Sequence, residues 1–146
     1  MPAALQADDI AHVIQLAVAP VFLLTGIGAM VSVLSHRISR IVDRARVLEE
    51  RLAKADKDQA MAIHVGLSTL ARRARLVNIA ITLCVACALL VCTVVALLFI
   101  GTFLDLNLAA AVAWLFIAAM AILIASLLVF LREIRLAIAS LRIGPR

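Results

Sequence analysis

The chain has 146 residues, of which 66% are apolar and 16% charged, and its formal net charge at pH 7 is +5. Soluble domains are closer to half apolar, so this composition excludes an ordinary soluble globular domain. The stretches at residues 11–35, 76–104 and 106–131 contain no Asp, Glu, Lys or Arg. Each is longer than the roughly 20 residues that a helix needs to cross a bilayer. We therefore predict an all-α integral membrane protein with three spans, at about residues 10–35, 77–103 and 107–131.

The first predicted span places polar and small side chains on one face. Residues three, four or seven positions apart lie on the same side of a helix. At these spacings the span carries Gln15, Phe22, Thr25, Ala29, Ser32 and His36. One interpretation is a water-lined path formed when several copies assemble. The other is a packing face against the second and third spans, with its hydroxyl groups bonded to backbone carbonyls one turn earlier.

Residues 36–76 are predicted to form a helical hairpin that continues the first and second spans. Apolar residues recur at alternating spacings of three and four on both sides of a polar turn, a pattern typical of coiled coils. They are Ile38, Ile41, Ala45, Leu48 and Leu52 before the turn, and Ala60, Ile63, Leu67, Leu70, Ala74 and Val77 after it. Two such stripes joined by a short link favour an antiparallel, coiled-coil-like hairpin.

The basic residues set the expected orientation, because residues 34–77 hold ten of the fourteen lysines and arginines. Lysine and arginine accumulate in cytoplasmic loops, so we expect the hairpin and the C-terminus inside and the N-terminus outside. No aromatic residue lies among the basic residues of the hairpin, which argues against nucleic-acid binding.

Six hairpin arginines are predicted to contact anionic lipid of the inner leaflet or a cytoplasmic partner. They are Arg37, Arg40, Arg44, Arg72, Arg73 and Arg75. The alternative is a solvated helical face whose charges pair locally. The spacing would allow the pairs Arg40–Asp43, Arg46–Glu50 and Glu50–Lys54.

The second span contains Cys84 and Cys87, with Cys92 nearby. Since all three lie in the middle of a span without a second ligand pair, we interpret them as small apolar filler. The third span is rich in alanine, and small residues four apart allow close helix approach. Examples are the pairs Ala109/Ala113 and Ala121/Ala125.

Residues 132–146 alternate apolar and basic side chains, which predicts a helix lying against the inner leaflet. Elsewhere the chain shows no nucleophile with a base, no paired carboxylates and no phosphate-binding glycine loop. We therefore predict no enzymatic activity, no cofactor and no metal site.

Three runs of the sequence resemble a known family: LAVAPVFLL at residues 16–24, GIGA at residues 26–29 and RISRIVDRARVLE at residues 37–49. The family is the bacterial domain-of-unknown-function family numbered 2721, which comprises small integral membrane proteins of about this length. The resemblance implies a bacterial inner-membrane protein with three spans. It implies no activity and no catalytic or binding residues.

The favoured prediction for function is a non-enzymatic interaction or scaffold protein that forms homo-oligomers. Its hairpin would dock a cytoplasmic protein or organise copies of the chain. The alternative is a small oligomeric ion channel or pore lined by the polar face of the first span.

Overall fold

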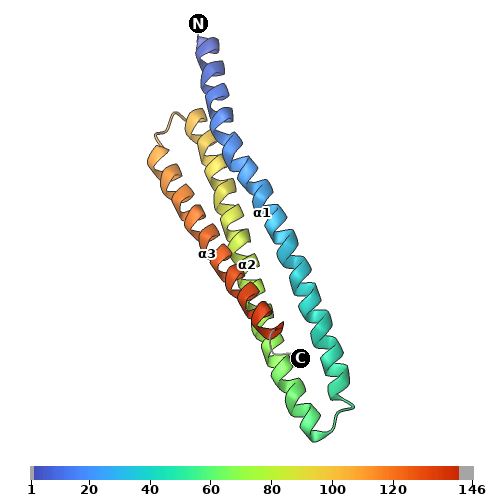
Figure 1. Cartoon of the computed structure of the whole chain (residues 1–146). Coiled ribbons are helices and arrows are strands. Elements are labelled where there is room, and N and C mark those ends of the chain that lie inside the picture. Colours follow the sequence, from blue (N-terminus) through green and yellow to red (C-terminus); the bar gives the residue numbers. More distant parts are fainter. Residues whose placement is uncertain (1, 142–146) are drawn as a thin grey trace. The chain divides into compact units, whose positions relative to one another are not determined.

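The structure is a computed structural model that describes the backbone of residues 2–141 and the surroundings of side chains 8–139. It contains the helices α1 (Pro2–Leu52), α2 (Lys57–Phe103) and α3 (Ala109–Leu141) (Figure 1). All three are long and apolar enough to cross a membrane. The prediction of an all-α protein with three helices long and apolar enough to span a membrane is thereby confirmed.

Short turns with polar residues separate the helices. Asp56 stands just before α2, where its side chain accepts a hydrogen bond from the backbone N–H of Lys57 at 2.9 Å. Its carbonyl accepts the N–H of Ala60 at 2.8 Å, so Asp56 caps the helix. At the other end of α2, Asp105 adopts a φ of 53°, a left-handed conformation that aspartate tolerates and that ends the helix.

The chain divides into two compact units, each of which contains a segment of every helix. The first unit holds α1 up to Val31 together with Leu83–Ile124. The second holds Ser32–Thr82 and the part of α3 that begins at Ala125. Each unit has its own buried side chains and is described separately.

In the first unit, α2 presents a stripe of small side chains to its neighbours. Cys84, Cys87 and Val91 have no exposed surface, and neither has Ala119 of α3. The Cys87 thiol donates a hydrogen bond to the Ala119 carbonyl at 3.2 Å, so the two helices approach closely. Close packing of small residues stabilises helix pairs in a membrane, where lipid removes most of the hydrophobic driving force.

The structure shows which small residues of α3 are buried by the other helices of the chain. Ala109, Ala113 and Ala121 are exposed, whereas the fully buried small residues of this helix are Ala119 and Ser126, seven positions apart. The other helices of the chain therefore leave most of the predicted alanine pairs uncovered, and their close approach to a helix of a second copy stays a prediction. In a helix that is apolar on every side, sequence does not distinguish the face that packs from the face that meets lipid.

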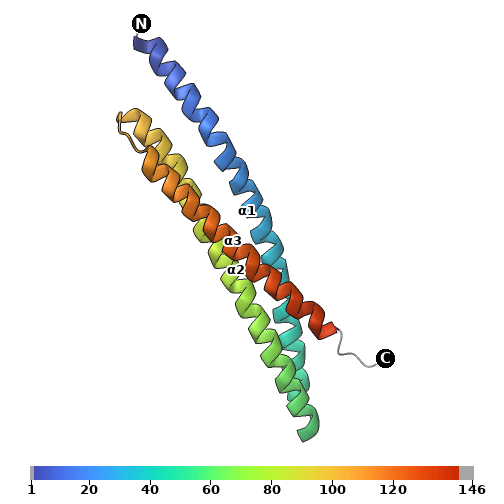
Figure 2. The ribbon, with the colours of Figure 1, turned by 60° about the vertical axis from the view of Figure 1, so that its left-hand side comes forward.

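In the second unit, residues 32–52 of α1 and 57–82 of α2 run back along each other from a short turn (Figures 1 and 2). Every residue of the two predicted apolar stripes is buried or half-buried. Ile41 is 5% exposed, Leu70 7% and Val77 0%. A Cβ placed on Gly66 would lie 3.5 Å from the Leu48 Cδ1 atom, which shows that the two arms are in contact.

Helix α3 enters the second unit at Ala125 and continues to Leu141, ten residues beyond the end of the charge-free stretch at residue 131. The Ser126 hydroxyl donates a hydrogen bond to the Ala80 carbonyl at 2.9 Å, and Glu133 has no exposed surface. The first part of the predicted interfacial tail thus continues α3 and packs against other helices through one side. The position of the tail at the inner leaflet stays a prediction, and residues 142–146 lie outside the described part of the chain.

The α2–α3 contact in the first unit predicts the effect of enlarging Ala119. In the Ala119→Leu variant, the larger side chain has no space, and overpacking of this kind costs about 1–3 kcal/mol. The free energy of unfolding is measured by far-ultraviolet circular dichroism as SDS is titrated into detergent micelles. The matched control is Ala118→Leu on the exposed side of the same helix turn, which should change the stability little. Equal stability of the two variants would contradict the contact.

Candidate functional site

The second unit contains a buried carboxylate held by two arginines. Arg37 of α1 donates from Nη1 to the Glu133 Oε2 atom at 2.8 Å. Arg73 of α2 donates from Nε and Nη2 to the Glu133 Oε1 atom at 3.2 and 3.0 Å. Among the described residues, these two contacts are the only ion pairs. Glu133 of α3 therefore connects all three helices.

Helical spacing explains why these arginines face inward. Arg37 stands three residues after Leu34 and four before Ile41, both of which are buried. Arg73 stands in the same relation to the buried residues Leu70 and Val77. Both arginines thus occupy an inward-facing position of an apolar stripe. Glu133 lies two helical turns after the buried Ser126, which places it on the packed face of α3.

Burial of this cluster makes its charges interdependent. The Glu133 side chain is 0% exposed, that of Arg73 15% and that of Arg37 37%. Arg37 also lies over the Phe130 ring, with 5.1 Å between its guanidinium carbon and the ring centroid. That distance is within the range of a cation–π contact. A buried carboxylate is stable only when paired and hydrogen-bonded, so the two arginines are required wherever Glu133 is ionised.

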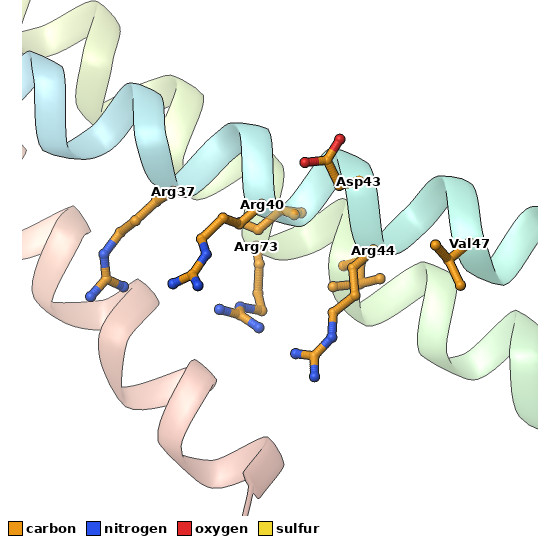
Figure 3. A pocket seen from close by; sticks show the side chains of 8 residues that line it. Arg37, Arg40, Asp43, Arg44, Val47 and Arg73 are labelled. Carbon is orange, nitrogen blue, oxygen red and sulfur yellow. The ribbon is translucent and has the colours of Figure 1, made fainter.

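A groove of about 710 Å³ opens beside this cluster. Four arginines line it, together with Ile41, Asp43, Val47 and Leu70; the arginines are Arg37, Arg40, Arg44 and Arg73. Figure 3 shows the four guanidinium groups on the same side of α1, while the Asp43 carboxylate projects to the opposite side. Arg40 and Arg44 are exposed and form no ion pair with any residue that the structure describes. The groove therefore has an excess of positive charge.

The six arginines predicted to contact lipid or a partner fall into two groups. Arg37, Arg40, Arg44 and Arg73 line the groove, whereas Arg72 and Arg75 are exposed outside it. The local pairs allowed by the spacing are not formed, because both ion pairs of residues 8–139 involve Glu133. That part of the solvated-face interpretation is wrong. Exposed lysine and arginine side chains gain little from local pairing and remain solvated.

The polar face of the first span lies at the surface of the chain. All six of its predicted members are exposed, namely Gln15, Phe22, Thr25, Ala29, Ser32 and His36. The Thr25 hydroxyl donates to the Val21 carbonyl at 3.4 Å, one turn earlier, as expected for a membrane helix. The helices of the same chain do not cover this face, so it does not pack against the other spans as the second interpretation required. A water-lined path stays a prediction.

The cysteines and acidic residues form no further site in the described part of the chain. Cys84 and Cys87 are buried and Cys92 is exposed. Within residues 8–139, no group of three or more His, Cys, Asp or Glu side chains could hold a metal ion.

Sequence reasoning missed Glu133, although it is the only acidic residue after position 105. The available signal was its position seven residues after Ser126, on one face of a helix that continues from the span. The alternation of apolar and basic residues in the tail predicts an interfacial helix, and that pattern assigns no role to a single carboxylate. Its partners are 96 and 60 residues away in sequence, so no local pattern connects them.

The fold and this cluster define a class: membrane proteins of three helices in which a buried carboxylate connects all three. The family model described as "Protein of unknown function (DUF2721)" matches residues 17–143, and the chain belongs to that family. The resemblance noted from the sequence is thereby confirmed. A search of curated proteins and a search of solved structures each found no match.

The cluster predicts that Arg73 contributes strongly to stability. The Arg73→Ala variant leaves Glu133 buried with one, more exposed partner, and breaking a buried ion pair costs about 3 kcal/mol or more. Unfolding by SDS, followed by circular dichroism, measures the loss. Arg37→Ala should cost less, because that side chain is more exposed and its interaction is weakened by solvent.

Arg72→Ala is the matched control for charge, and it should change the stability by no more than about 0.5 kcal/mol. The double variant Arg73→Ala with Glu133→Ala should lose less than the sum of the two single variants, because the two side chains interact directly. Additive losses would contradict the pairing.

Proposed function

We propose that the protein is a non-enzymatic membrane interaction protein that forms homo-oligomers and binds partners through the arms of α1 and α2. The observation that carries this proposal is the set of large apolar side chains exposed on the arms. Val42 is 47% exposed, Val47 49%, Met61 73% and Val65 63%. These residues lie outside the charge-free stretches, where water rather than lipid would meet them. Met61 and Val65 stand one helical turn apart, and neighbouring exposed apolar side chains in such a position are typical of contact surfaces.

The arms are proposed to be a cytoplasmic, coiled-coil-like hairpin of a bacterial inner-membrane protein. Their ten basic residues support this orientation through the preference of lysine and arginine for the cytoplasmic side. The N-terminus would then lie outside and the C-terminus in the cytoplasm. The burial of both apolar stripes supports coiled-coil-like packing.

A second candidate function is a small oligomeric pore. It is favoured by the exposure of the polar face of α1, which includes Gln15, Thr25 and Ser32. A polar face turned to lipid is unfavourable, and several copies around an axis would give it a hydrated environment. Both candidates require a homo-oligomer, but they use different surfaces.

Both candidates predict a mass larger than that of a monomer. Light scattering of the detergent-solubilised protein should give a multiple of the chain mass over a range of concentrations. If the exposed apolar patch holds the copies together, Met61→Glu with Val65→Lys should lower that mass. The control is Gln59→Glu with Ala71→Lys, which places the same charges at exposed positions on other sides of α2. A monomeric mass for the unaltered protein at every concentration would contradict both candidate functions.

The two candidates differ in their response to changes in α1. If the protein is a pore, Gln15→Leu with Thr25→Val should abolish ion flux in liposomes. The same variant should leave the binding of a partner protein to the arms of α1 and α2 unchanged. Replacing residues 44–72 by a short glycine–serine linker should have the opposite effect, and it keeps the Glu133 cluster. The control for the first variant is Ile14→Leu with Val18→Leu, which alters exposed apolar positions of the same span. No flux in the unaltered protein would leave the interaction protein as the function.

A further inference from the structure

We propose that the groove lined by Arg37, Arg40, Arg44 and Arg73 is a binding site for the phosphate group of an anionic phospholipid. The proposal goes beyond general attraction between basic residues and membranes, because it assigns the phosphate to one set of side chains. It also holds for either function above, since its four arginines belong neither to the exposed apolar residues of the arms nor to the polar face of α1.

The groove lies where the charge-free stretches end. Arg37 is the first charged residue after residues 11–35, and Arg73 closely precedes residues 76–104. Glu133 closely follows residues 106–131. The cluster that joins these three residues therefore marks the boundary between hydrocarbon and headgroups. A ligand at this depth meets lipid phosphates at far higher local concentration than soluble anions.

The arginines of α1 point toward that boundary. Helical side chains lean toward the N-terminus of their helix. In Figure 3, Arg37, Arg40 and Arg44 lean toward the N-terminal, bluer end of α1, which is the end that leads into the first span. Their guanidinium groups are therefore directed back toward the headgroups rather than outward into water.

Glu133 fixes part of the site in advance. Each guanidinium has five N–H donors. Arg37 uses one nitrogen on Glu133 and Arg73 uses two, so each keeps further N–H groups for another acceptor. Side chains already held in place lose less entropy when a ligand binds. Arg40 and Arg44, which have no ion-pair partner among the described residues, supply the charge that the ligand neutralises.

The charge and the walls of the groove match a phospholipid. Of the four arginines, only Arg37 and Arg73 pair with a carboxylate, that of Glu133, and the Asp43 carboxylate projects away from the guanidinium groups. Planar guanidinium groups bind phosphate oxygens through paired hydrogen bonds. The apolar walls of Ile41, Val47 and Leu70 suit the uncharged part of a lipid better than a fully hydrated phosphate ion.

The test is native mass spectrometry of the full-length protein with phosphatidylglycerol, compared with phosphatidylcholine of the same acyl chains. We expect the unaltered protein to retain phosphatidylglycerol preferentially. Arg40→Gln with Arg44→Gln should weaken that binding about tenfold or more, because it removes two charge-assisted contacts. Both residues are exposed and outside the Glu133 cluster, so unfolding by SDS should be unchanged.

The matched control is Arg72→Gln with Arg75→Gln, which removes the same charge outside the groove. It should weaken binding about threefold or less, the effect of general surface attraction. Equal losses in the two double variants, or no loss in either, would overturn the proposal. If neither lipid nor phosphate binds, the proposal is also overturned and a carboxylate-bearing protein becomes the better ligand.

Competition with inorganic phosphate tests whether the bound phosphate group belongs to a lipid or to a free phosphate ion. Added in millimolar excess, inorganic phosphate should displace phosphatidylglycerol only weakly if the lipid is the ligand. If inorganic phosphate displaces the lipid as efficiently as soluble phosphatidylglycerol does, the assignment to a lipid is wrong. A monomeric mass in the oligomer measurement would leave this site unaffected.

Discussion

A carboxylate with no exposed surface needs partners at fixed positions, and Glu133 has two of them on two different helices. Removing a carboxylate from water is so unfavourable that the surrounding structure must supply hydrogen bonds and opposite charge. This requirement fixes where α1, α2 and α3 face one another in the second unit. It also places Arg37 and Arg73 beside Arg40 and Arg44, so the groove depends on the same interaction.

The rest of the packing relies on close approach and on single polar contacts. The Cys87 thiol bonds the Ala119 carbonyl in one unit, and the Ser126 hydroxyl bonds the Ala80 carbonyl in the other. Such contacts suit a membrane protein, because lipid competes with apolar side chains but does not compete for hydrogen bonds. Where the arms leave the charge-free stretches, apolar stripes such as Ile41 and Leu70 take over the packing.

The surface of the chain offers three different chemical environments. The arginine groove is basic and lies where the charge-free stretches end, the arms expose Met61 and Val65, and the polar side of α1 exposes Gln15 and Thr25. The proposals above assign to them a phosphate, a protein surface and water, respectively. The three surfaces are tested at different residues: Arg40 and Arg44 in the groove, Met61 and Val65 on the arms, and Gln15 and Thr25 on the polar side of α1.

The sequence by itself determined the number of helices, their approximate ends and the buried faces of the arms. These properties follow from local quantities: the length of a charge-free stretch, and the spacing of Ile41 or Leu70 among polar neighbours. Only the tertiary structure decided the packed side of α3, since alanine occurs on every side of that helix. It alone also revealed the role of Glu133, because a buried ion pair depends on residues distant in sequence that become neighbours when three helices pack.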